Sequence, residues 1–202
     1  MEFLVTMTTH VPDGTAPETV DDVRAREAAH SRRLAEQGHL LRLWRPPLQP
    51  GEWRTLGLFA ADDDQELEQV LAAMPLRIWR TDEVTALAPH PNDPAARTQQ
   101  GPDGAQEFLA TITISIPRDA PAETIADTAS REAGRAGELA EQGHLERLWM
   151  LPSLSGDQRA LGLWRAADAG AMTAILESLP LLAWISVEMT PLTVHPSDPA
   201  AA

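Results

Sequence analysis

Two periodicities alternate along the first half of the chain and predict its secondary structure. Residues 3–9 are rich in β-forming residues, and apolar positions three and four apart predict a helix over 17–37 that ends at Gly38. The pattern then predicts strands over 40–45 and 54–61, a helix over 64–73 and a last strand over 78–87. The order βαββαβ is typical of the ferredoxin-like arrangement, in which an antiparallel sheet carries both helices on one face.

The second half of the chain repeats the first half at an offset of 105 residues. The segment LAEQGH begins at Leu34 and again at Leu139, and roughly 43 of about 95 aligned positions are identical without a gap. We therefore predict one repeat over 1–91 and a second over 107–202. The polar residues between them, 92–106, contain Pro and Gly and indicate a flexible linker.

Each predicted repeat leaves one face of its sheet uncovered. A domain of about 95 residues with a single small core is only marginally stable. We expect the two copies to pair within the chain as an internal pseudo-dimer. The predicted fold class is therefore α+β, with two ferredoxin-like repeats forming an intramolecular dimeric α+β barrel, and further homo-oligomers are left open.

The amino-acid composition limits the binding partners and the catalytic groups that the chain can have. The formal net charge of -14 opposes binding to nucleic acid or to an anionic membrane, and no apolar run reaches the length of a membrane span. Without a secretory signal, we expect a cytoplasmic protein. The chain has no Cys, Tyr or Lys, so a proton transfer must use Asp, Glu, His or a bound water. No His and carboxylate pair has the spacing of a metal site, and no metal is expected.

Glu27 is the first candidate for chemistry because of its position on the predicted helix. It lies on the same helical stripe as Val23, Ser31 and Leu34, and Glu132 takes the equivalent place in the second repeat. A carboxyl group held against an apolar sheet has a raised pKa and becomes a competent base and acid near neutral pH. The alternative is a glutamate that leans outward and pairs with a neighbouring arginine.

Arg45 and Trp44 end a predicted strand, where a guanidinium can bind a carboxylate or stabilise an enolate oxygen beside the indole. A surface arginine at a strand end is the alternative. Arg42 fits a substrate contact or a structural ion pair. His39 follows the glycine that ends the helix, where it fits a substrate contact or a hydrogen bond to a terminal carbonyl.

The repeated tryptophans form the last group of candidates. Trp79 and Trp149, with Trp44, supply large rings for the wall of an apolar cavity that would accept planar unsaturated ligands. Their simpler role is in the hydrophobic core.

An ordered set of motifs in each repeat resembles the muconolactone isomerase family. In the first repeat these are F-x-V-x-M at the start, Glu27, the segment 38–45 that ends in LWR, the tripeptide 74–76 and the pair 90–91. The resemblance spans nearly the whole of each repeat. It implies a dimeric α+β barrel, no cofactor, a small-molecule substrate, and a one-proton shift of a carbon–carbon double bond in an unsaturated lactone.

The chain also departs from the family pattern. Thr6 and Thr111 stand where the family carries a basic residue, and the LWR motif becomes LWM at Met150. We expect a substrate other than muconolactone, and a first repeat that is more active than the second. The leading hypothesis is an isomerase acting on a small unsaturated lactone, enone or polyketide-like compound. The alternatives are a cofactor-free cyclase or monooxygenase of the same barrel, or a non-catalytic ligand-binding protein.

Overall fold

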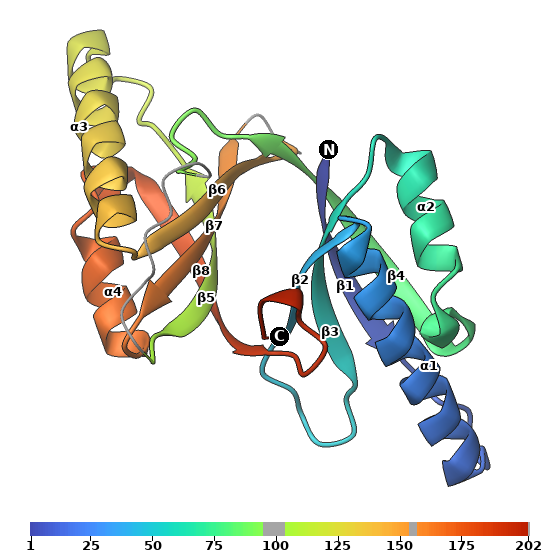
Figure 1. Cartoon of the computed structure of the whole chain (residues 1–202). Helices are drawn as coiled ribbons and strands as arrows, with labels where there is room; N and C mark the ends of the chain where they lie inside the picture. Colours follow the sequence, from blue (N-terminus) through green and yellow to red (C-terminus); the bar gives the residue numbers. More distant parts are fainter. Residues whose placement is uncertain (95–103, 154–156, 202) are drawn as a thin grey trace. The chain divides into compact units, whose positions relative to one another are not determined.

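The computed structural model describes residues 1–94, 104–153 and 157–201 (Figure 1). The chain divides into two compact units. The first consists of Met1–Leu87 and Thr193–Ala202, and the second of Ala88–Leu192. Within the described residues, no helix combines the length and the apolarity needed to cross a membrane.

The first unit follows the predicted order βαββαβ. Its elements are β1 (Glu2–Thr9), α1 (Pro17–Glu36), β2 (Leu40–Arg45), β3 (Arg54–Ala60), α2 (Asp64–Ala72), the short 3-10 helix η1 (Pro75–Trp79) and β4 (Arg80–Pro89). The strands pair antiparallel in the order β4-β1-β3-β2, and both helices lie on one face of this sheet (Figure 1). The last strand begins at Arg80 and not at residue 78, because Pro75 starts a 3-10 turn that runs to Trp79.

The second unit repeats this architecture. Its elements are β5 (Gln106–Ile114), α3 (Ala122–Glu141), β6 (Leu145–Leu151), β7 (Gln158–Ala166), α4 (Ala169–Glu177), η2 (Leu182–Trp184) and β8 (Ile185–Val194). The strand order is β8-β5-β7-β6, with α3 and α4 on one face (Figure 1). The predicted α+β class and the two ferredoxin-like repeats are therefore confirmed.

The long helix of each unit ends as the sequence predicts. Gly38 adopts a φ of 79°, a left-handed conformation that costs glycine little, and the His39 amide donates to the Leu34 carbonyl at 2.8 Å. Gly143 ends α3 in the same way, with a φ of 73°. This turn sends the chain directly into β2 or β6. The inward stripe of α1 is also confirmed, because Val23, Ser31 and Leu34 are its buried residues.

The hydrophobic core of the first unit joins its sheet to its helices. Phe3 and Val5 of β1 and Phe59 of β3 are fully buried against Leu34 of α1 and Leu71 of α2. Removing such large apolar side chains from water contributes about 1.5 to 3 kcal/mol each. The core therefore holds α1 in a fixed rotation over the sheet, and this rotation decides where the polar residues of its inner stripe point.

Each unit also contains a short tail from the opposite sequence repeat. The last residues of β8, Thr193 and Val194, pair with β2 and belong to the first unit. The last residues of β4, Ala88 and Pro89, pair with β6 and belong to the second unit. The compact units thus differ from the sequence repeats at their ends. The predicted linker, 92–106, begins within the second unit, and its residues 95–103 lie outside the described part of the chain.

A buried aspartate anchors the tail of the first unit. The Asp198 carboxylate accepts hydrogen bonds from the Leu43 amide at 3.3 Å and from the Arg42 guanidinium at 3.1 Å. The Asp198 side chain is 0% exposed and that of Arg42 is 12% exposed. The guanidinium also stacks over Trp44, 4.9 Å from its ring centre. This contact fixes residues 195–197 beside the end of β2.

The second unit uses the same anchor at matching positions. Asp93 accepts from the Leu148 amide at 2.9 Å and pairs with Arg147 at 3.2 Å, and Arg147 stacks over Trp149. Both partners are somewhat more exposed than Asp198 and Arg42, so water screens this pair more.

Asp198→Ala is expected to lower the free energy of unfolding by about 1 to 3 kcal/mol, because it removes the acceptor of the buried Leu43 amide and one ion-pair partner of Arg42. Chemical denaturation followed by tryptophan fluorescence measures the change. Asp127→Ala is the control, since the Asp127–Arg131 pair is exposed and its loss is expected to cost under about 1 kcal/mol. Equal small effects of both substitutions would show that the Asp198 anchor does not hold the fold.

Candidate functional site

A cavity of about 260 Å³ lies in the first unit beneath the inner stripe of α1. Helix α1, all four strands, η1 and the exchanged tail contribute to its wall. The polar and charged residues of the wall include three arginines, a glutamate and a histidine. These residues are Arg24, Glu27, Arg45, Arg80 and His195.

Glu27 projects from α1 into this cavity wall, and its side chain is only 12% exposed. One carboxylate oxygen accepts the Leu76 amide at 2.8 Å, and the other lies 3.2 Å from the Arg80 guanidinium. Burial raises the pKa of Glu27 above its ordinary value of 4.5, while the Leu76 hydrogen bond and the Arg80 charge oppose this rise. Nearby Asp82 adds to the rise in the Glu27 pKa.

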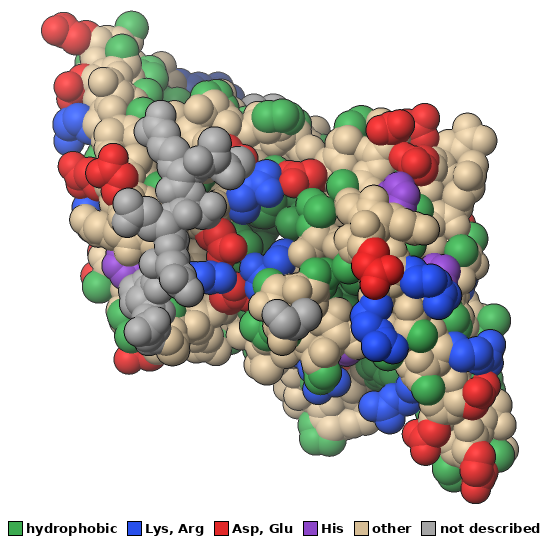
Figure 2. Space-filling model, viewed as in Figure 1, with side chains coloured by type: hydrophobic (Ala, Val, Ile, Leu, Met, Phe, Trp, Pro, Cys, Tyr) green, Lys and Arg blue, Asp and Glu red, His purple; other side chains and the backbone are tan. Residues whose placement is uncertain are grey.

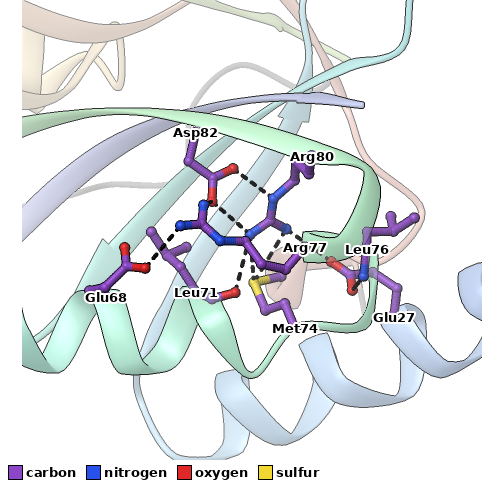
Figure 3. A network of polar contacts seen from close by, with 8 residues as sticks. All are labelled: Glu27, Glu68, Leu71, Met74, Leu76, Arg77, Arg80 and Asp82. Atoms are coloured by element: carbon purple, nitrogen blue, oxygen red, sulfur yellow. Dashed lines mark hydrogen bonds and ion pairs between the residues drawn. The ribbon is translucent and has the colours of Figure 1, made fainter. Parts of the chain in front are cut away.

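Arg80 is held by a network of alternating charges that is buried around Arg80 and reaches the surface at Glu68 (Figure 3). The side chains of Arg80 and Asp82 are 2% and 3% exposed, and their closest atoms lie 2.6 Å apart. Asp82 also pairs with Arg77, which pairs in turn with Glu68 at 2.9 Å. Because Arg80 shares its charge between Glu27 and Asp82, it holds Glu27 in place without fully neutralising it.

His195 of the exchanged tail supplies a neutral hydrogen-bonding group. Its Nδ1 accepts the Ser197 amide at 3.1 Å, which leaves the ring hydrogen on Nε2 in the neutral tautomer. Burial and the neighbouring Arg45 lower the pKa of His195 to about 4, so the ring is uncharged at neutral pH. His195 therefore adds an N–H donor to the cavity wall, with no positive charge of its own.

Two further arginines give the cavity a cationic side. Arg45 lies at the exposed end of β2, and no carboxylate in the described part of the chain forms an ion pair with it. Arg24 stacks over Trp53, 5.3 Å from the ring centre, and its pair with Asp21 is exposed and 4.0 Å long. Figure 2 shows arginine side chains gathered along α1, which has four arginines where α3 has two.

The structure brings only some of the predicted site residues together. Glu27 and Arg45 share the wall of the first cavity, and Glu132 lies on the wall of a second cavity. The other predicted substrate-binding residues lie outside both walls: Trp44, Trp79, Arg42, His39 and Trp149. Trp44 and Trp149 are buried beside the aspartate anchors that their stacked arginines bind. The His39 Nδ1 bonds to the Ala60 carbonyl at 3.0 Å, at the end of β3, so its contact is structural but is made to a strand and not to the end of the helix.

Arg80 is the main site residue that the sequence reasoning missed. A signal for it exists in the comparison of the two repeats. Arg80 and Asp82 are two residues apart on β4 and are replaced together by Ile185 and Val187 on β8. Such a joint replacement of a cation and an anion by two apolar residues indicates that the charges depend on each other.

The second unit holds a cavity of about 180 Å³ at the equivalent place. Glu132 lies on its wall and accepts the Leu181 amide at 3.0 Å, as Glu27 accepts that of Leu76. Burial raises the pKa of Glu132, and the Leu181 hydrogen bond opposes the rise. Within the described residues, no group of three or more His, Asp or Glu side chains is arranged to hold a metal ion.

Fold and cavities together define a protein of two ferredoxin-like α+β units, each with a partly buried glutamate on the wall of a small cavity. The muconolactone delta-isomerase family matches residues 1–93 and again 106–198. The chain belongs to this family and contains its domain twice.

Similar proteins agree with this assignment. The chain is 34% identical over 92 residues to muconolactone delta-isomerase 1 of Acinetobacter lwoffii, which covers 46% of this chain and 93% of that protein. It is 32% identical to muconolactone delta-isomerase of Cupriavidus pinatubonensis over 46% of this chain and 97% of that protein. A heme-binding protein from Thermus thermophilus matches 98% of the chain and 93% of its own, with a TM-score of 0.59 and 14% identity. This last likeness concerns the fold alone.

Glu132→Gln is expected to stabilise the protein more as pH rises. Below the ordinary pKa of 4.5 the carboxyl is protonated in both states; above it the unfolded chain loses its proton first, so the buried glutamate becomes a cost. Glutamine keeps an acceptor for Leu181 and carries no charge. Thermal unfolding midpoints compared at about pH 4 and about pH 8 measure the effect.

Glu177→Gln is the matched control for this prediction. It changes the net charge equally, at an exposed position of α4. A gain from Glu132→Gln that is as large at low pH as at high pH would contradict the raised pKa.

Proposed function

We propose that the first unit is a cofactor-independent isomerase that moves a carbon–carbon double bond in a small unsaturated lactone, enone or polyketide-like substrate. The observation that carries this proposal is Glu27, a buried carboxylate with a raised pKa on the wall of a cavity. A raised pKa makes a carboxylate a stronger base, which suits it to remove a proton and then return it. Membership of the muconolactone delta-isomerase family supports the same chemistry.

The proposed reaction uses one proton and no external reagent. The Glu27 carboxylate removes a proton from the carbon next to the double bond, and the electron pair moves into the conjugated carbonyl to form a dienolate. The neutral Nε2–H of His195 and the Arg45 guanidinium stabilise the developing oxygen charge. The protonated Glu27 then returns its proton to the far carbon, and the double bond takes its new place.

The arginines favour a substrate that carries a carboxylate. Arg45 and Arg24 place two positive charges on the cavity wall, and Arg45 has no ion-pair partner within the described residues. Arg45 and Arg24 thus supply positive charge to a site in which Thr6 stands where the family carries a basic residue. The cavity, at about 260 Å³, is smaller than the roughly 300 to 1,000 Å³ typical of sites for drug-sized ligands. A single ring with a short acidic substituent suits both its charge and its size.

Glu27→Gln is expected to reduce turnover by about 10²- to 10⁴-fold, because it preserves the shape of the site and removes the general base. Isomer formation and deuterium uptake from D₂O are followed by NMR on a panel of unsaturated lactones with and without a carboxylate. Substrate binding is expected to change little, since Arg45 and Arg24 remain.

Glu132→Gln is the matched variant, because it makes the same change at the equivalent position of the second unit. Turnover that survives Glu27→Gln but is lost in Glu132→Gln would show that the reaction takes place in the second unit, which would contradict the proposal. If the unaltered protein turned over none of the carboxylated lactones, the proposed substrate class would be refuted.

Arg80 is proposed as a positioning residue that acts through Glu27. Its charge lowers the Glu27 pKa, so Arg80→Met is expected to raise that pKa and move the acidic limb of the kcat/KM profile to higher pH. Asp82 keeps its pair with Arg77 in this variant. The pH dependence of kcat/KM over the same substrate panel measures the shift.

Arg80→Lys retains the positive charge and is expected to restore most of the original profile. Arg54→Met is the control, because Arg54 lies on β3 outside the cavity wall and pairs with Glu52. A purely structural role for Arg80 would lower stability and leave the acidic limb where it was.

A further inference from the structure

The cavities of the two units have walls built from the same sequence positions. Met7 and Ile112 correspond, as do Leu43 and Leu148, and the exchanged tail contributes a histidine to each wall. Because the two cavities share this backbone arrangement, a difference in ligand binding between them depends on the wall side chains that differ.

Those changes leave no arginine among the described residues that line the second cavity. Where the first wall has Arg24 and Arg80, the second has Ala129 and Ile185. Position 45 is likewise an arginine only in the first unit, since Met150 takes its place in the second. The second wall is therefore mainly apolar.

Within the described part of the chain, the ionisable groups on this wall are Glu132 and His90, beside Asn92 and Gln158. The His90 Nδ1 accepts the Asn92 amide at 3.0 Å, and burial lowers the pKa of His90, so the ring is neutral. An anionic ligand would lose its hydration, meet the Glu132 carboxyl and find no arginine among the wall residues that the structure describes. A neutral ligand avoids this cost and can exchange a hydrogen bond with Glu132 or His90.

The size of the second cavity limits the ligand further. Its volume is about 180 Å³. An apolar cavity of about 150 Å³ is large enough to hold a benzene molecule. One five- or six-membered ring therefore fits, and an additional acidic side arm has no arginine to bind among the described residues of the wall.

We propose that the second unit holds a separate binding site for a small uncharged ring compound with one hydrogen-bonding group, seated against Glu132. This site goes beyond the isomerase activity proposed for the first unit. The protein would then bind a charged and an uncharged ligand in equivalent cavities of one chain.

Two backbone amides make the test specific for each site. The Leu181 amide bonds to Glu132 and the Leu76 amide bonds to Glu27, so their NMR signals report separately on the two cavities of the full chain. The probes are the neutral butenolide ring and its carboxymethyl derivative. The neutral ring is expected to shift the Leu181 signal, and the carboxymethyl derivative is expected to bind there at least about a hundredfold more weakly.

Two variants of the second cavity complete the experiment. Ala160→Leu fills the cavity from β7 and is expected to abolish the Leu181 shift, while Thr55→Leu makes the matching change in the first cavity and spares that shift. The double change Ile185→Arg with Val187→Asp restores the charged pair of the first unit and is expected to admit the carboxymethyl derivative. Circular dichroism confirms that each variant is folded.

Three results would overturn the proposal. The neutral ring leaves the Leu181 signal unmoved up to its solubility limit, or the carboxymethyl derivative shifts that signal at the same concentration as the neutral ring. The third is a Leu181 shift that persists in folded Ala160→Leu. None of these results bears on turnover by Glu27, which is measured separately.

Discussion

A buried carboxylate at the base of each exchanged tail holds the sites of this protein together. Asp198 receives the Leu43 amide and the Arg42 guanidinium, and three residues before it His195 lies on the cavity wall. Asp93 does the same for His90 in the second unit. Each cavity is therefore completed by residues from the opposite repeat. An alteration at either aspartate acts on the site through the position of the tail, without touching the glutamate.

The chemistry of the first cavity depends on how far Arg80 neutralises Glu27. The Arg80 charge favours the ionised carboxylate and so lowers the pKa of Glu27, but Asp82 binds the same guanidinium and limits this effect. Burial and the charge of Asp82 outweigh this attraction, since the pKa of Glu27 is raised overall.

Features that depend on local sequence were predictable, and features that depend on long-range placement were not. The helix ending at Gly38 and the inward phase of Glu27 follow from residues within a few turns of each other. The pairing of Glu27 with Arg80 joins residues 53 positions apart and depends on how η1 turns the chain into β4. The exchange of the tails was not predictable either, because the sequence around His195 does not indicate which unit the tail packs against.

Duplication within one chain explains how the two cavities came to differ. The matching relatives span a single repeat, since 92 residues cover 93% of one of them. A gene for a single repeat encodes a single site, so a substitution in that site is present in every copy of the protein. In the tandem chain, Arg80 and Asp82 can persist in one cavity while Ile185 and Val187 occupy the other. Replacing only one partner of a buried ion pair is costly, because the remaining charge stays buried with less of the opposite charge that stabilised it. Replacing both charges by apolar residues in the second unit avoids this cost. It also gives the second cavity a wall that suits an uncharged ligand.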